Sequence, residues 1–156
     1  MNAVEMMSVL ERKRMVRDES VEGPLSGLSL HGVTFRNVDF CEVSFADCSI
    51  SSVTFTQCSF QGVDFKGATL KNITLHECDL SEADLTKQHL NQFIVANSNF
   101  ARANLSEAII DKCAINASDF TGARFDRSQL VKTSVSKSPV ADASFVDIAW
   151  ESFSMC

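Results

Sequence analysis

Large apolar residues recur at every fifth position through most of the chain. Between Ser44 and Phe65 they are Phe45, Ile50, Phe55, Phe60 and Phe65, and the same spacing continues unbroken from Leu25 to Met155. Helices repeat apolar residues at three and four positions, and half-buried strands repeat them at two. The pattern therefore predicts neither element alone, but a structure that buries one residue in five, which we call the centre.

A second class of small or apolar residues lies two positions before each centre, as at Val33, Val38, Val43 and Cys48. From Leu25 onward, no Asp, Glu, Lys or Arg occupies either class. Burying an unpaired charge costs several kcal/mol, so sequences avoid it strongly. We therefore expect two residues of every five to point inward, and we call the second class the inward position.

Residue types also agree at intervals of twenty. One set of inward positions reads Val43, Val63, Ala83, Ala103, Ala123 and Ala143, and the positions before three centres read Thr34, Thr54 and Thr74. This agreement predicts coils of four sides that stack with a period of twenty residues. Gly27, Gly32, Gly62, Gly67 and Gly122 all stand two positions after a centre, where the chain has to turn a corner.

The motif "VTFRN VDFCE VSFAD" from Val33 to Asp47 resembles the pentapeptide-repeat family. The resemblance implies an all-β solenoid, a right-handed quadrilateral parallel β-helix in which five residues form one side. We expect this solenoid over residues 25–156, as about six and a half coils. Coils stacked about 4.8 Å apart would form a rod roughly 30 Å long.

Residues 1–24 lack the repeat and predict a short amphipathic α-helix. Met6, Met7 and Leu10 are its candidate contact residues, with Val4 and Arg14 on the same side as Met7 and Leu10. A cap over the first coil is one role, since solenoids need their terminal apolar surface covered. A helix that docks a partner or dimerises is the alternative. No secretory signal and no apolar run of about 20 residues is evident, so we expect no membrane span.

Packing explains most of the cysteines, and the histidines lie too far apart to act together. Cys48, Cys58, Cys78 and Cys113 stand at inward positions, where a free cysteine behaves as a small hydrophobe, while Cys41 and Cys156 point outward. Unpaired core thiols without a signal sequence favour a reducing cytoplasm. His31, His76 and His89 lie at outward positions, too far apart to converge on a reaction centre. We expect no enzymatic activity, no metal site and no cofactor.

The charge balance limits the class of partner. The formal net charge is −6, and residues 1–24 hold 4 of the 14 basic and 5 of the 20 acidic residues, which leaves −5 for the repeat region. Nucleic-acid binding requires a basic stripe, so no nucleic-acid partner is expected. The family resemblance implies an alternative, because its quinolone-resistance group consists of acidic dimeric rods that resemble DNA and engage type II topoisomerases. Those relatives carry projecting loops and a C-terminal dimerisation helix, and this repeat contains neither. Plain solubility also accounts for the acidity.

The C-terminal coil is unusually aromatic. It contains Phe145, Trp150, Phe153 and Met155. An uncovered final coil would expose both apolar side chains and unpaired strand edges. Symmetric homodimerisation, a heterologous protein partner and self-capping are the three ways of covering it, and aromatic residues are typical anchors of interfaces.

The stretch from Thr86 to Ser98 departs from the repeat. Gln88 replaces a small inward residue, Phe93 is large for its inward position, and Ile94 stands where Ser, Thr or Asp is usual. With Ile109 and Val131 near the adjoining corner, these residues predict an exposed apolar interaction site. A local bulge, filled by Phe93 and with Gln88 satisfied by backbone groups, is the alternative.

A solid rod offers surface but no cavity, so protein binding is the function that the sequence favours. We expect a non-enzymatic scaffold or adaptor, cytoplasmic and bacterial, such as an accessory of a secretion machine. Its partners would be proteins or a second copy bound through the C-terminal end. A DNA-mimicking modulator of a type II topoisomerase is the alternative function.

Overall fold

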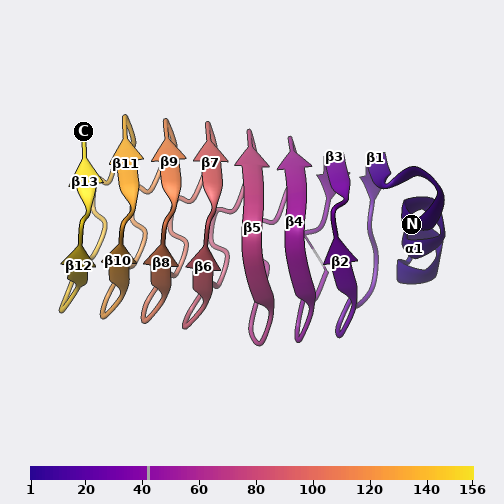
Figure 1. The fold of residues 1–156 in the computed structure, drawn as a ribbon, viewed down its shortest axis with the longest axis horizontal. Helices are drawn as coiled ribbons and strands as arrows, with labels where there is room; N and C mark the ends of the chain where they lie inside the picture. Colours follow the sequence, from indigo (N-terminus) through magenta and orange to yellow (C-terminus); the bar gives the residue numbers. More distant parts are fainter. Residues whose placement is uncertain (42) are drawn as a thin grey trace.

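The computed structural model spans residues 1–156 and describes residues 1–41 and 43–156. It is a parallel β-solenoid of about seven turns with one short helix. Helix α1 (Ala3–Lys13) lies at one end of the row of strands and the C-terminus lies at the other (Figure 1). The predicted solenoid fold is therefore confirmed.

Strands form two adjacent sides of each coil. Leu30 pairs with Ile50, Ile50 with Leu70, and Phe35 with Phe55, so partners lie twenty residues apart, as the sequence columns predict. The strands are β1 (Met15–Ser20), β2 (Ser29–His31), β3 (Thr34–Asp39), β4 (Ser49–Thr56), β5 (Thr69–His76), β6 (His89–Asn91), β7 (Ile94–Ala96), β8 (Ile109–Asp111), β9 (Ala114–Asn116), β10 (Gln129–Val131), β11 (Ser134–Ser136), β12 (Ala149–Glu151) and β13 (Ser154–Met155).

The other two sides consist of turns joined by isolated bridges, such as Asp79 with Asn99 and Asn99 with Asp119. An Asp, Asn or Ser residue before the centre holds many of these turns. The Asp79 carboxylate accepts a hydrogen bond from the backbone N–H of Ser81 at 2.9 Å, and the Asn99 side chain accepts one from Ala101 at 2.9 Å. Such bonds from Asp and Asn to the backbone two residues later are typical of turns.

Among the described residues, the corner residue two positions after a centre has a left-handed backbone conformation. It is glycine at Gly67 (φ 76°), but Arg102 (φ 59°) and Ala117 (φ 50°) adopt the same region. A Cβ at Gly67 would meet the carboxylate of Asp47, so that exposed side chain would have to move aside. The predicted positions of the glycines are confirmed, although most corners use residues with a Cβ.

Phenylalanine stacks fill the interior. Phe35 lies on Phe55, with ring centroids 5.2 Å apart, and Phe40 lies on Phe60 at 5.0 Å. Both pairs are nearly parallel, at 11° and 8°. Every centre from Leu25 to Val135 is buried, and together with the inward side chains they form one continuous core.

The N-terminal segment covers the first coil. Asn2 and Glu5 form a reciprocal capping box at the start of α1, and Met6 (0% exposed) and Leu10 (3%) pack into the core. Val4, expected on the same side of the helix as Leu10, is 80% exposed instead. No helix among the described residues is long and apolar enough to cross a membrane.

Strand β1 adds a rung that the sequence analysis did not predict. It pairs in parallel with β3, and Val16 takes a centre opposite Phe35. Val21 is buried in the following position, and its N–H donates to the Asp39 carbonyl at 2.9 Å. The repeat therefore reaches back into residues 1–24, with a step of four residues instead of five from Val21 to Leu25.

Candidate protein-interaction surfaces

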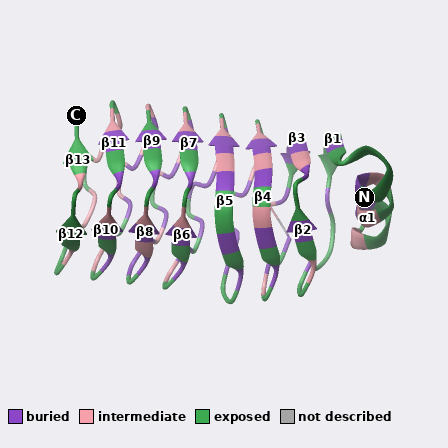
Figure 2. Cartoon of the chain, viewed as in Figure 1, coloured by how far each residue is buried: buried purple, intermediate pink, exposed green. Residues whose placement is uncertain are grey.

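The final coil exposes apolar side chains at the end of the rod. We call this the C-terminal surface, formed by Val140, Phe145, Trp150, Phe153 and Met155. Trp150 is 60% exposed and Met155 is 48% exposed, whereas Val140, Phe145 and Phe153 are half-buried. Strands β12 and β13 are exposed throughout, unlike the central strands β4 and β5 (Figure 2). The sequence analysis singled out four of these five residues.

The same coil ends the β-ladder. Strand β12 pairs only with β10, and β13 pairs only with β11, so within the described chain the outer edges of β12 and β13 have no partner. Each edge presents unpaired N–H and C=O groups beside the aromatic rings. The C-terminal surface thus combines apolar area with free backbone hydrogen-bonding groups.

The N-terminal end is covered. Met6 and Leu10 pack against the solenoid and Met7 is half-buried, so the apolar face of α1 is turned inward. The helix residues that the sequence analysis named as contacts therefore lie mainly in the core and not on a free docking face.

The structure does not gather the residues around Ile94 into one apolar patch. Ile94 is 55% exposed, but its neighbours along the side are Thr74 and Ala114. Ile109 and Val131 are half-buried at opposite ends of the neighbouring strand side, on β8 and β10. Phe93 is buried, with 6% of its surface exposed, and fills the interior. Only Ile94 itself presents a large apolar surface here.

The groups capable of chemistry do not converge. Among the described residues, no cluster of three or more His, Cys, Asp and Glu side chains could hold a metal ion. All six cysteines are free, and burial raises the pKa of the Cys113 thiol to about 11. His31 Nδ1 lies 2.9 Å from the Ser51 hydroxyl, and His76 lies beside Glu77, on different coils.

One turn side carries most of the excess acidity. It contains Asp39, Asp79, Glu82, Asp119 and Asp142, and Arg102 is the one basic residue described there, bound to Glu82 at 2.6 Å. The hydroxyl and the backbone N–H of Thr121 both hydrogen-bond Asp119 and hold the pKa of its carboxyl below the ordinary value. We call Asp39, Asp79 and Asp119, which occupy equivalent positions on this side, the acidic column.

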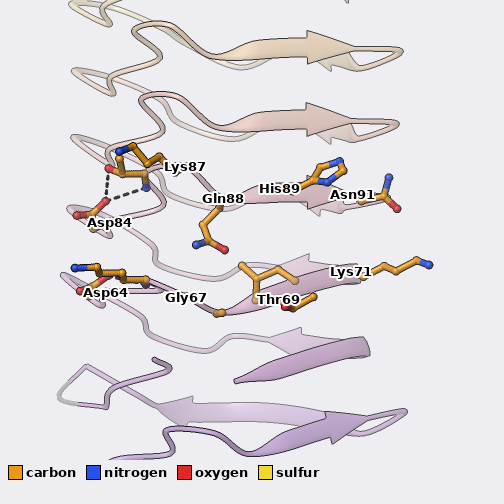
Figure 3. Close-up of a pocket in the computed structure, with 13 residues that line it drawn as sticks. Asp64, Gly67, Thr69, Lys71, Asp84, Lys87, Gln88, His89 and Asn91 are labelled. Carbon is orange, nitrogen blue, oxygen red and sulfur yellow. Dashed lines mark hydrogen bonds between the residues drawn. The ribbon is translucent and has the colours of Figure 1, made fainter. Parts of the chain in front are cut away.

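A groove opens on the flank of the rod beside Gln88 (Figure 3). Its volume is about 950 Å³, and it lies between the coil of Asp64 and Lys71 and the coil of Asp84 and Asn91. The sequence analysis identified Gln88 as a departure from the repeat but did not predict a groove.

Comparisons with known proteins agree with this architecture. The family model described as a pentapeptide repeat region matches residues 25–85, and the model for pentapeptide repeats (8 copies) matches residues 89–127 and 98–136. A comparison with curated proteins finds no match.

Several solved structures are similar over most of their length. Rfr23, a pentapeptide repeat protein from the cyanobacterium Cyanothece 51142, is 16% identical over 98% of this chain and 99% of that chain, with a TM-score of 0.47. QnrB1, a plasmid-mediated fluoroquinolone resistance protein, is 17% identical over 88% and 89%, with a TM-score of 0.40. HetL from Nostoc sp. strain PCC 7120, involved in heterocyst differentiation regulation, is 14% identical over 96% and 94%, with a TM-score of 0.33. With two family models covering most of the repeat, the chain belongs to the pentapeptide-repeat family.

Proposed function

We propose that the protein is a non-enzymatic scaffold that binds other proteins, and that its C-terminal surface pairs with a second copy of the chain. The observation that carries this proposal is the exposed Trp150 beside the unpaired edges of β12 and β13. The solid core and the scattered titratable groups support a binding role over a catalytic one. The unpaired core thiols support a cytoplasmic location.

A second copy is the occupant that best matches the chemistry of this surface. Two ends related by a two-fold axis would place β12 and β13 of one rod against the same strands of the other. Each edge would then satisfy the free backbone groups of its partner, while Trp150 and Phe153 bury apolar area at the centre. The N-terminal helix would remain at the distal ends of the pair, and the long sides would stay free for other proteins.

Light scattering coupled to size-exclusion chromatography tests this proposal. The purified chain should elute as a dimer, and Trp150→Ala combined with Phe153→Ala should convert it to monomers. Ser52→Ala, at a regular corner far from the end, is the matched control and should remain dimeric. A wild-type chain that is monomeric at all concentrations would exclude pairing through this end.

Modulation of a type II topoisomerase is a second candidate function, favoured by the acidic column of Asp39, Asp79 and Asp119. A supercoiling assay with purified gyrase tests it. Asp79→Asn with Asp119→Asn should abolish any effect, because Asn removes the charge while keeping the turn, as Asn99 does naturally. An effect that survives both substitutions, or no effect of the wild-type chain, would exclude this function.

A further inference from the structure

The β-ladder is interrupted between the coil of β5 and the coil of β6. Strands β5 and β6 are joined only at Lys71 and Asn91, whereas β6 and β8 pair at all three positions. The bond expected from the His89 N–H to the Ala68 carbonyl is not formed, although the equivalent bond from Thr69 to Cys48 measures 2.8 Å. The two coils are therefore separated locally, and the groove of Figure 3 occupies this separation.

Gln88 accounts for the separation. It occupies an inward position whose neighbours on the adjacent coils are Ala68 and Ala108, so its longer side chain needs space that the column does not otherwise provide. The opening lies on one side only, because Ile109 still donates to the Gln88 carbonyl at 2.9 Å. Gln88 thus acts as a wedge between its own coil and the preceding one.

The carboxamide of Gln88 has no partner within the described chain. The residue is 94% buried, at 6% exposure, and its amide is aimed into the space above Gly67, where no hydrogen bond reaches it (Figure 3). The amide reaches the groove, where a water molecule or a ligand can supply the hydrogen bonds that the chain does not. The free N–H of His89 and C=O of Ala68 add a second unsatisfied donor and acceptor beside it.

Three lysines and two aspartates line the groove, namely Lys66, Lys71, Lys87, Asp64 and Asp84. Lys87 lies 3.8 Å from Glu107, and Asp84 accepts hydrogen bonds from the N–H and hydroxyl of Thr86. Lys66 and Lys71 form no ion pair with any described residue, and they flank the groove on the same coil. The carboxylates of Asp64 and Asp84 are held by groups of their own turns. The groups without any partner are therefore the amide donors and acceptors in the middle and the two ammonium groups at the sides.

We propose that this groove binds a short acidic peptide segment of a partner protein. A peptide backbone supplies both the acceptor and the donor that Gln88, His89 and Ala68 lack, and carboxylate side chains match Lys66 and Lys71. The volume of about 950 Å³ accommodates a few residues. This lateral site lies away from the C-terminal surface, so its test is independent of self-association.

Titration of the ¹⁵N-labelled chain followed by NMR tests the proposal. The probe is the peptide acetyl-Glu-Gly-Glu-amide, with acetyl-Lys-Gly-Lys-amide and glutarate as controls. The acidic peptide should shift the Gln88 side-chain NH₂ and the His89 N–H in a saturable way, while glutarate, which lacks amides, and the basic peptide should not. No saturable shift, or equal shifts with the basic peptide, would overturn the proposal.

Two substitutions separate the effect of the length of the Gln88 side chain from the effect of its amide group. Gln88→Ala should close the ladder, slow hydrogen exchange at the His89 N–H and abolish binding, since Ala108 shows that alanine fits this column. Gln88→Met retains the length of the side chain, so exchange at His89 should stay fast while binding weakens about tenfold. Wild-type affinity in Gln88→Met, or unchanged exchange in Gln88→Ala, would contradict the roles given to Gln88.

Discussion

The indole ring of Trp150 stacks on the ring of Phe153, with centroids 5.7 Å apart and planes 10° apart. This pair lies on the last coil, where Trp150 remains 60% exposed. The other parallel-stacked pairs join rings of consecutive coils, and apart from Phe145 those rings are buried. Here one face of the aromatic layer is open to solvent. The environment of Trp150 should therefore change when another molecule covers the end of the rod.

Trp150 is the single tryptophan of the chain, so its fluorescence reports on this surface alone. Its emission should lie at long wavelength in dilute solution and move to shorter wavelength as the concentration rises and a second copy excludes water. Val146→Asp, which places a charge at an exposed apolar residue of the same coil, should suppress the shift. An emission maximum independent of concentration in the wild-type chain would contradict pairing through the C-terminal surface.

Replacing alanine by glycine should change the free energy of unfolding in opposite directions at a left-handed corner and in a strand. Ala117 has φ 50°, so Ala117→Gly relieves backbone strain and should raise the free energy of unfolding by about 1 kcal/mol. Ala114, an exposed residue of β9, is the matched control, and Ala114→Gly should lower it by about 1 kcal/mol. Denaturation in guanidinium chloride measures both, and equal signs would show that corner strain is not the determinant.

The phenylalanine stacks should dominate stability. Phe40 is fully buried and lies 5.0 Å from Phe60 and 5.3 Å from Phe35, so Phe40→Ala should lower the free energy of unfolding by about 3 to 5 kcal/mol. Phe153→Ala, at the half-buried end, should lower it by about 1 to 2 kcal/mol in the monomer. Equal losses would indicate that the C-terminal coil is covered as completely as the middle.

Asp119 should make the stability of the folded chain sensitive to acid. Its pKa is lowered in the folded chain by the hydrogen bonds from Thr121, so its contribution is present above the unfolded pKa of about 3.9. That contribution is lost as the pH falls through the lower folded value. Asp119→Asn keeps the turn bond that Asn99 illustrates, so it should flatten the pH dependence of stability below about pH 4. Urea denaturation at several acidic pH values measures this, and an unchanged slope would exclude a role for Asp119.

The solenoid could be predicted because inward and outward positions differ so sharply in charge. Leu25 to Met155 keep one register, and the Asp, Asn and Gly positions mark the turns. The sequence pattern does not reveal strand β1, and the reason is physical. Val16 and Val21 are five residues apart, but Glu19 stands at the position that pairs with Val38, and the next step to Leu25 is four residues. Glu19 is exposed, because no earlier coil covers it.

The surfaces were harder to predict than the fold. Sequence alone places Trp150 and Phe153 on the last coil, where Trp150 is 60% exposed and Phe153 is half-buried. Phe93 and Ile94 are adjacent in sequence, yet Phe93 fills the core and Ile94 faces solvent. The groove depends on how Gln88 fits against Ala68, so a pattern of single positions marks the irregular residue without showing which side of it opens.

The left-handed corners also fix how such a rod can change its length. Because the described sides from Leu25 onward end in the same backbone conformation, an insertion or deletion that is not a multiple of five would place a corner residue in the core. Only a multiple of twenty would also leave each column of side chains on its original side. The length of the rod therefore changes in steps of about 4.8 Å, one for each coil added or removed. Any surface displayed on it, such as the acidic column or the groove at Gln88, keeps a fixed distance from the C-terminal end as long as the coils between them are preserved.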